Sequence, residues 1–316
     1  MKFWASTAFS PPEHYVPLAR AAEAAGVHGL LMSDHIFFPK HRASRYPYSA
    51  TGEPIWAPET PWPDVWVTVG AMLSATTTLH FGTSVYIAPA RDLFTVAKQV
   101  GTAAVLSGDR VHLGLGAGWM REEFDQTGQS FTNRGRRTDE MIEALRVLWR
   151  GGWVEFHGSY YDFGPLQIEP APRRTVPIWC GGHSDAALRR AARHCDGWIG
   201  NAYTEEDADH YLGELDRHLA EAGRTGEPFE IIIGLYAAPT PEVIGRWEAR
   251  GVTGILCMPW FLAERTDDGD VSNVQGTTSL DRKIEATMHF GETVIGPLAR
   301  ASSRDQRRGG SAGVNR

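Results

Sequence analysis

The chain has 316 residues, of which 42% are hydrophobic and 22% are charged, as expected for a globular protein with a large buried core. Its 31 basic and 38 acidic residues give a formal net charge of -7, which argues against nucleic acid or an anionic membrane as the main partner. The three cysteines lack metal-type spacing and the N-terminal segment lacks a signal-peptide core, so we expect a reduced, cytoplasmic protein.

Short apolar segments alternate regularly with amphipathic segments along the chain. The strand candidates cover 2–7, 28–33, 79–85, 110–116, 176–182, 196–201, 229–236 and 252–259. The helix candidates cover 13–25, 65–75, 93–108, 136–150, 184–194, 205–223, 241–251 and 279–295. The strand candidates are continuous apolar runs, which is typical of parallel strands buried on both faces. These units predict an α/β fold, a closed (β/α)8 TIM barrel, with an open doubly wound sheet as the alternative.

Two segments exceed what the barrel needs. Residues 36–63 form a long loop after the second strand, rich in proline and aromatic residues, which favours an ordered lid or pocket wall. Residues 151–175 contain two aromatic runs around a Gly-Ser pair, which predicts an inserted hairpin before the fifth strand. We expect one barrel domain over 1–300 and a disordered tail over 301–316, where little can be buried.

Polar residues follow the second and third strand candidates, at the barrel end where active sites lie. Asp34 and His35 together provide a carboxylate and an imidazole, which suits ligand binding and proton transfer near neutral pH, although a helix cap or surface pair is the alternative. Thr83, Ser84 and Val85 end the third strand candidate with small side chains that let a flat ligand approach, or simply end the strand.

Glycine-rich turns follow the fourth and fifth strand candidates. The first, 114–118, has the spacing GxGxG, which permits close backbone approach to a ligand or close packing of strand on helix. It matches a Rossmann fingerprint poorly, because Asp139 falls inside a predicted helix. The second, 181–184, opens a helix whose amide groups and dipole favour a phosphate, the alternative being a plain N-cap by Ser184.

Other enzyme classes match the chain poorly. No HxH motif follows the first strand candidate, and we expect no metal site. No GxSxG motif indicates covalent catalysis, and no lysine directly follows a strand candidate, which counts against a Schiff-base aldolase. A phosphorylated-sugar isomerase or aldolase barrel stays as an alternative from another class.

The strand ends, taken together, resemble the luciferase-like monooxygenase superfamily, and more narrowly its branch that uses the deazaflavin coenzyme F-420. The resemblance covers roughly residues 1–295. Its most specific blocks are LLMSDH, FGTSVYIAPARDLFTVAKQV, LSGDRVHLGLGAGWMREEF, RGRRTDEMIEALRVLW, FHGSYYDF and PIWCGGHSDAALRRAA.

The resemblance implies residue roles at the carboxyl mouth of the barrel. It implies that His35 is the catalytic acid/base and that the Ser84–Val85 peptide bond is cis, supporting the ring of the cofactor. The cofactor-binding residues that it implies are Asp34, Ser84, Val85, Ala117, Gly118, Glu122, Gly181, Gly182, His183 and Ser184. It further implies that the acidic tail of F-420 is attracted by basic residues of the loops, namely Lys40, Arg42 and Arg45 or, in their place, Arg173 and Arg174. The alternative for each of these residues is a solvated loop charge.

The cofactor decides the expected reaction. With F-420, a hydride moves between the cofactor and a small organic substrate; with FMN, the alternative, reduced flavin from a separate reductase leads to oxygenation. A non-catalytic flavin-binding relative is a further alternative. The resemblance also implies a homodimer. An aromatic or apolar substrate pocket is indicated by Tyr46, Tyr48, Trp56, Trp62, Trp119 and Trp260.

Overall fold

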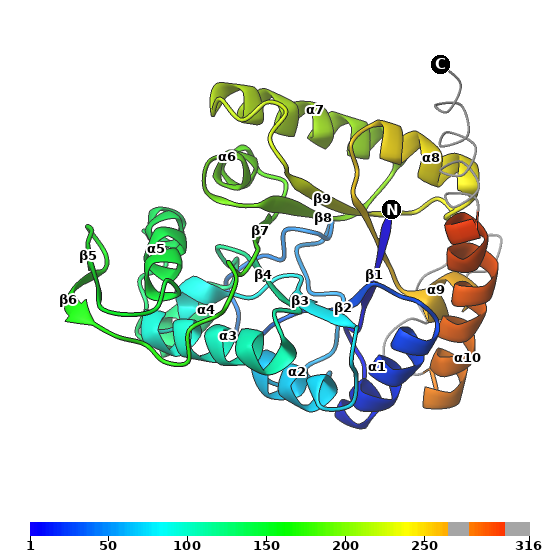
Figure 1. The fold of residues 1–316 in the computed structure, drawn as a ribbon, viewed down its shortest axis with the longest axis horizontal. Coiled ribbons are helices and arrows are strands. Elements are labelled where there is room, and N and C mark those ends of the chain that lie inside the picture. The colour runs from blue at the N-terminus through cyan, green and yellow to red at the C-terminus, as the bar shows by residue number, and fades with distance from the viewer. Residues whose placement is uncertain (265–277, 301–316) are drawn as a thin grey trace, which may run out of the picture.

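A computed structural model describes residues 1–264 and 278–300 of the chain. Parallel strands close into a barrel in the order β1-β10-β9-β8-β7-β4-β3-β2, with helices around it (Figure 1). The predicted TIM barrel is therefore confirmed, and the open-sheet alternative is wrong. The barrel strands are β1 (Lys2–Ser6), β2 (Gly29–Met32), β3 (His80–Thr83), β4 (Val111–Leu115), β7 (Ile178–Gly181), β8 (Gly197–Tyr203), β9 (Glu230–Leu235) and β10 (Gly254–Cys257).

Most outer helices begin at a side chain that caps the first turn. Asp64, Asp92, Ser184, Thr204, Thr240 and Ser279 each accept a hydrogen bond from the backbone amide three residues further on. Such a cap stabilises a helix by about 1 kcal/mol. The outer helices are α1 (Tyr15–Ala24), α2 (Val65–Leu73), α3 (Leu93–Ser107), α5 (Arg134–Leu148), α6 (Asp185–His194), α7 (Glu205–Glu221), α8 (Pro241–Ala249) and α10 (Leu280–Phe290).

Two short helices were not expected from the sequence, α4 (Arg121–Gln126) and α9 (Pro259–Glu264). Each has six residues, too few for a clear apolar period to emerge against the loop around it. Each is the first α-helix after a barrel strand, β4 or β10, so both lie toward the carboxyl mouth of the barrel. Among the described residues no helix has the length and apolar character needed to cross a membrane.

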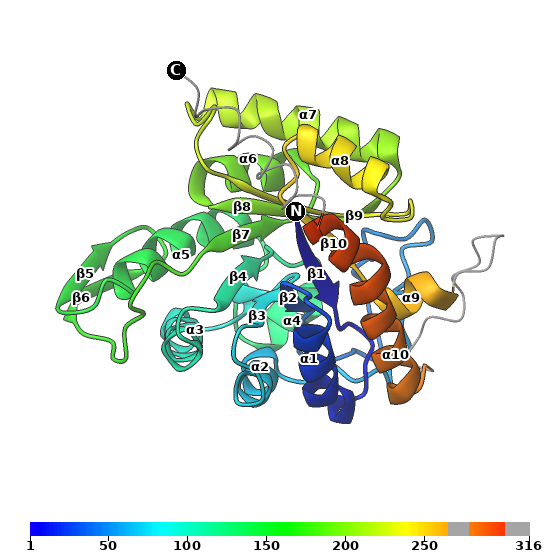
Figure 2. The same cartoon turned by 45° about the vertical axis from the view of Figure 1, so that its right-hand side comes forward.

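The inserted hairpin is confirmed as β5 (Val154–His157) paired antiparallel with β6 (Asp162–Leu166). It lies beyond α5, away from the barrel (Figure 2). The Glu140 side chain on α5 accepts hydrogen bonds from the amides of Ser159, Tyr160 and Tyr161 in its turn, at 2.6–2.9 Å. The Phe163 ring of β6 also packs against Phe94 of α3, with ring centroids 5.5 Å apart, so two helices hold the hairpin.

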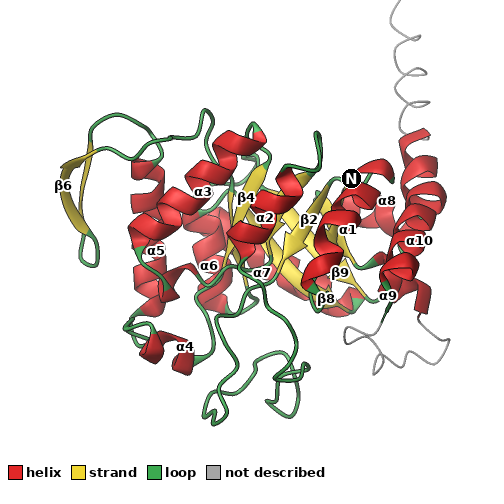
Figure 3. Ribbon diagram, turned by 90° about the horizontal axis from the view of Figure 1, so that it is seen from below, coloured by secondary structure: helices red, strands yellow, loops and turns green. Residues whose placement is uncertain are grey.

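The long loops and the hairpin lie toward opposite ends of the barrel. The 36–63 loop follows β2 and therefore leaves the carboxyl end, where long loops gather beside α4 (Figure 3). Residues 167–177 lead into β7 and therefore lie at its amino end. The expectation that Arg173 or Arg174 anchors a cofactor tail is wrong for this reason, since both precede β7. The predicted tail at 301–316 lies outside the described residues.

The inside of the barrel is filled by Trp4, Leu31, Trp179, Ile199 and Ile232, with Val85 and Leu256 packed against them. A larger apolar layer lies between the strands and the surrounding helices. The barrel is therefore a packed core, and ligands are expected only at its mouth.

Candidate active site at the carboxyl mouth

Val85 forms the top of the packed barrel interior. It follows β3 after Ser84, and the Ser84–Val85 peptide bond is cis, as the resemblance implies. A Cβ added to Gly116 would lie 2.6 Å from Val85 Cγ2, and one added to Gly181 would lie 2.3 Å from Val85 Cγ1. The two glycines therefore make room for the Val85 side chain, and the contact of Ser84 and Val85 with a cofactor stays a prediction.

Asp34 is buried and fully engaged by its own chain. Arg91 donates to both carboxylate oxygens, at 2.8 and 2.9 Å, and the amide of Ile87 donates at 2.9 Å. Burial alone would lower the pKa of the Arg91 guanidinium, but the adjacent Asp34 carboxylate outweighs burial and raises it. Asp34 therefore holds the loop after β3 in place, and its predicted contact with a cofactor stays a prediction.

His35 is paired with a glutamate that comes from a distant part of the chain. Its Nδ1 lies 3.1 Å from Oε1 of Glu123, which also accepts a hydrogen bond from the amide of Ile36 at 2.7 Å. The Glu123 side chain is fully buried, and that of His35 is 9% exposed. The carboxylate fixes the ring orientation and favours the tautomer with a proton on Nδ1, which leaves Nε2 to exchange a proton.

Glu123 is the site residue that the sequence analysis missed. It lies in α4, a helix that was not expected. The sequence offered no signal that separates Glu123 from Glu122, because adjacent helix residues point in different directions and the burial of Glu123 is visible only in the structure.

Glu122 holds the 36–63 loop over the mouth. Its Oε1 accepts hydrogen bonds from the amides of Ala43 at 2.6 Å and Ser44 at 3.2 Å. Burial opposes ionisation, but the hydrogen bonds from its own amide and from Ser44 and Ala43 prevail and lower the pKa of Glu122. Its predicted contact with the cofactor stays a prediction; the contacts observed are with the loop.

Aromatic rings from the loop and from the β4 turn surround His35. The ring centroids of Trp56, Trp62 and Trp119 lie 4.9, 5.1 and 5.7 Å from that of the imidazole. Three of the aromatic residues expected to line a substrate pocket therefore contact His35, the expected acid/base. Of the predicted loop cations, Arg42 is engaged by Glu53 and by backbone carbonyls.

The glycine turn before α6 is brought to the same mouth. Gly182 has φ +98°, which only glycine adopts readily, and its carbonyl accepts a hydrogen bond from the indole of Trp198 at 2.8 Å. The His183 ring stacks on Tyr211 at 4.9 Å, and burial lowers its pKa, so the ring is neutral at pH 7. Ser184 caps α6, so the alternative of a plain N-cap also fits; phosphate binding stays a prediction.

The other predicted glycine turn has a packing reason as well. A Cβ added to Gly118 would lie 2.7 Å from the ring of Phe124 and 2.8 Å from Ile87, and its φ of +80° favours glycine. Ala117 is partly exposed at the mouth. Contact of either residue with a cofactor stays a prediction.

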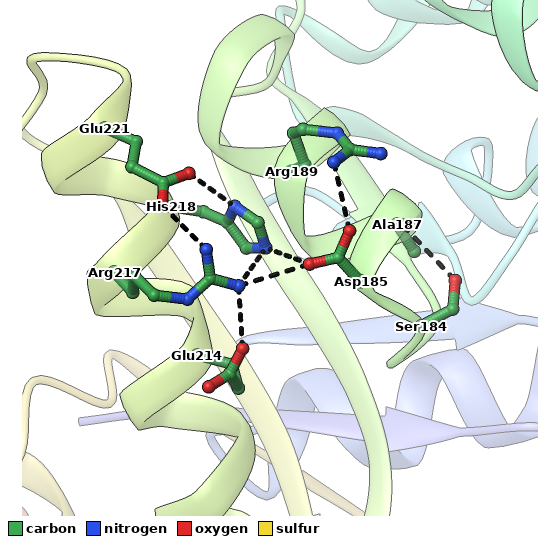
Figure 4. Close-up of polar contacts among 8 residues, drawn as sticks. All are labelled: Ser184, Asp185, Ala187, Arg189, Glu214, Arg217, His218 and Glu221. Atoms are coloured by element: carbon green, nitrogen blue, oxygen red, sulfur yellow. Dashed lines mark hydrogen bonds and ion pairs between the residues drawn. The ribbon is translucent and has the colours of Figure 1, made fainter.

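A cluster of possible metal ligands lies outside the mouth, between α6 and α7 (Figure 4). Ligand atoms of Asp185, Glu214 and His218 lie within 4.8 Å of one another. The Arg217 Nη2 atom, however, lies 3.2, 2.8 and 3.0 Å from atoms of the three. A guanidinium therefore supplies the positive charge in this cluster, which joins two helices.

A parallel barrel that brings a paired histidine and glycine turns to one mouth has the arrangement of a TIM-barrel enzyme. Residues 3–249 match the family model of luciferase-like monooxygenases, and the chain belongs to this family. An uncharacterised protein of Mycobacterium tuberculosis is 39% identical over 298 residues, which cover 93% of this chain and 99% of that protein.

Two further proteins are similar to the chain. The F-420-dependent glucose-6-phosphate dehydrogenase of Mycobacterium avium is 32% identical over 193 residues, or 60% of this chain and 53% of that enzyme. The structure of an F-420-dependent secondary alcohol dehydrogenase superposes with a TM-score of 0.62 at 20% identity, covering 90% of this chain and 84% of the other. At 20% identity, the similarity to the alcohol dehydrogenase structure shows a shared fold.

Four of the buried polar atoms without a partner belong to residues of the mouth and fit a bound polar group. Trp62 Nε1, Glu122 Oε2, Glu123 Oε2 and His183 Nδ1 are buried without a hydrogen-bond partner among the described residues. Folded proteins leave few such atoms unpaired, so each invites a ligand or water. Together with the amides that open α6, these residues fit a cofactor with a polar ring and a phosphate-bearing chain.

Proposed function

We propose that the protein is an oxidoreductase that transfers a hydride between F-420 and a small organic substrate. The observation that carries the proposal is the pairing of His35 with the buried Glu123 at the barrel mouth, inside a wall of tryptophans. The similarity to the F-420-dependent dehydrogenase of M. avium supports this cofactor.

The chain would hold the cofactor through two sets of residues. The Ser84–Val85 turn and the Ala117–Gly118 backbone would lie against the ring, and the residues 181–184 would bind the phosphate with the amides that open α6. Asp34 and Glu122 would act by fixing the loops around the ring, since their observed partners are Arg91 and the loop amides.

The proton step belongs to His35. Because Glu123 pairs with Nδ1, Nε2 stays available to give or take the proton that accompanies a hydride. A deazaflavin, when bound, supplies hydride transfer without oxygen chemistry. The tryptophan rings exclude water, which strengthens the charge interaction between His35 and Glu123.

The second candidate is an FMN-dependent two-component monooxygenase on the same fold, favoured by the family to which the chain belongs. That family membership favours either oxidoreductase over a phosphorylated-sugar isomerase or aldolase. We also propose a homodimer, which sedimentation of the purified chain tests directly.

Fluorescence titration of the purified chain with F-420 and, separately, with FMN tests the proposal. Tight binding of F-420 alone is the expected result, and preference for FMN would replace it with the monooxygenase. Gly182→Asp should abolish F-420 binding by placing a carboxylate at the phosphate. Because Gly182 has φ +98°, Gly182→Ala is the matched control for backbone strain.

A further inference from the structure

Residues 42–53 of the long loop after β2 form a closed unit, here called the flap. Arg42 at its start pairs with Glu53 at its end and also donates to the carbonyl of Gly52 at 3.3 Å. The amide of Tyr46 donates to the same carbonyl at 2.7 Å. Loops whose ends are tied together are compact units, so the flap can move as one body.

Hydrogen bonds join the flap to the barrel at one place, the start of α4. Oε1 of Glu122 accepts from the amides of Ala43 and Ser44, at 2.6 and 3.2 Å. The Ser44 hydroxyl accepts from the amide of Arg121 at 2.9 Å. Within the part of the chain that the structure describes, the flap makes its hydrogen bonds to other segments only here. A charged acceptor makes the stronger bonds, so the Glu122 carboxylate is the latch that holds the flap.

The flap lies against both glycine turns of the mouth. The Tyr46 ring contacts Trp119, directly after the first turn, with ring centroids 5.3 Å apart. The Tyr48 ring contacts His183 of the second turn at 5.3 Å, and its hydroxyl would lie 3.9 Å from a Cβ added to Gly182. A cofactor held by both turns therefore lies against the flap, and the Tyr48 hydroxyl stands beside the amides proposed to bind the phosphate.

We propose that the flap must lift from Glu122 before a flavin or deazaflavin enters or leaves the mouth, and that it closes again over the bound cofactor. Glu122 is thereby a positioning residue: it holds the flap and sets the rate of exchange, while the glycine turns set the affinity. The inference rests on the proposed function for the place of the cofactor, and it concerns access to that same site.

A latch that is closed in both the free and the bound chain has a kinetic signature. Breaking it raises the open fraction of both states by the same factor, so association and dissociation accelerate together. The ratio of the two rates, the Kd, then stays the same. A residue that binds the cofactor directly gives another result, because its loss mainly accelerates dissociation.

The first test breaks the latch. In stopped-flow fluorescence of the full chain with F-420, Glu122→Ala should accelerate association and dissociation about tenfold each and leave the Kd within about a factor of two. Asp125→Ala removes a carboxylate from the exposed face of the same helix and is the matched control, with both rates unchanged. Faster dissociation alone would make Glu122 a binding residue, and unchanged rates would separate the latch from exchange; either result overturns the proposal.

The second test locks the flap shut. The Ser44 hydroxyl lies 2.9 Å from the Arg121 amide, so cysteines at these two positions are placed to form a disulfide, and the three native cysteines are buried. In the oxidised double variant Ser44→Cys/Arg121→Cys, association and dissociation of F-420 should both slow at least about tenfold, and a reductant should restore them. Wild-type rates in the oxidised variant, with the disulfide confirmed by mass spectrometry, would overturn the proposal.

The flap and the F-420 proposal fail separately in these experiments. If FMN binds and F-420 does not, the same rates measured with FMN decide the flap, and only the choice of cofactor falls. If F-420 binds and its exchange rates do not change in the two variants, the flap falls alone. Binding of neither cofactor would remove both proposals.

Discussion

The two ends of this barrel carry the same kinds of residue in different states. At the amino end, His28 stacks on His80 at 4.6 Å, the Nδ1 of His80 lies 3.1 Å from Nε2 of His112, and Trp4 contacts all three rings. At the carboxyl end, His35 lies among three tryptophans. Of these four histidines, His35 is the one with a buried carboxylate as its partner.

That partner decides what each histidine can do. At the amino end, burial lowers the pKa of His28, His80 and His112, and the charge of Lys2 lowers each pKa further. The nearby carboxylate of Glu230 is engaged by Lys2 and by the indole of Trp179. Those rings are neutral packing elements. At the mouth, Glu123 can stabilise a proton on His35 during a reaction, so histidine beside tryptophan does not by itself identify an active site.

The largest expected effect separates the two ends. His35→Ala should lower turnover by about 100- to 10,000-fold, the range for loss of a general acid or base, with F-420 affinity nearly unchanged. His28→Gln at the other end should leave turnover within a factor of about two, once folding is confirmed by circular dichroism. Comparable losses of turnover in both variants would remove the distinction.

The next effect concerns the carboxylate alone. Glu123→Gln keeps the shape of the side chain and removes its charge, so turnover should fall about 10- to 100-fold, because the carboxylate that orients the His35 ring is lost. Glu122→Gln, one residue away, should lower turnover less, because Glu122 contacts the loop amides and not His35. An equal or larger loss of turnover in Glu122→Gln would contradict the pairing.

A smaller effect tests how the mouth is joined to the core. Gly181→Ala should destabilise the fold by about 1–3 kcal/mol, because its Cβ would lie 2.3 Å from Val85 Cγ1. Val85→Ala removes that atom, so the double variant should recover part of the loss in urea unfolding. Additive losses would show that the Val85 side chain does not decide why residue 181 is glycine.

Whether a feature of the fold or the site could be predicted from the sequence depended on how far apart along the chain its interacting residues lie. The strands, the hairpin and the mouth were predictable because apolar runs and turn residues are local signals, and parallel strands place their ends together. The His35–Glu123 pair was not, because 88 residues separate its members and the short α4 has no visible period. The Asp34–Arg91 pair was hidden for the same reason, so Asp34 was expected to bind a ligand, with a helix cap or a surface pair as the alternative.

The buried histidines at the amino end of the barrel should make the free energy of unfolding depend on pH in the acid range. The folded chain holds the pKa of His28 at about 3, through burial and then the charges near it, against 6.5 for an unperturbed histidine. Between these values the unfolded chain binds a proton that the folded chain does not, so the free energy of unfolding falls as the pH falls below 6.5. The slope from one such histidine is at most about 1.4 kcal/mol per pH unit, and less for His28 because it is partly exposed. Urea unfolding across that range should give a shallower dependence for His28→Gln than for the wild type, and an unchanged slope would mean that His28 titrates normally in the folded protein.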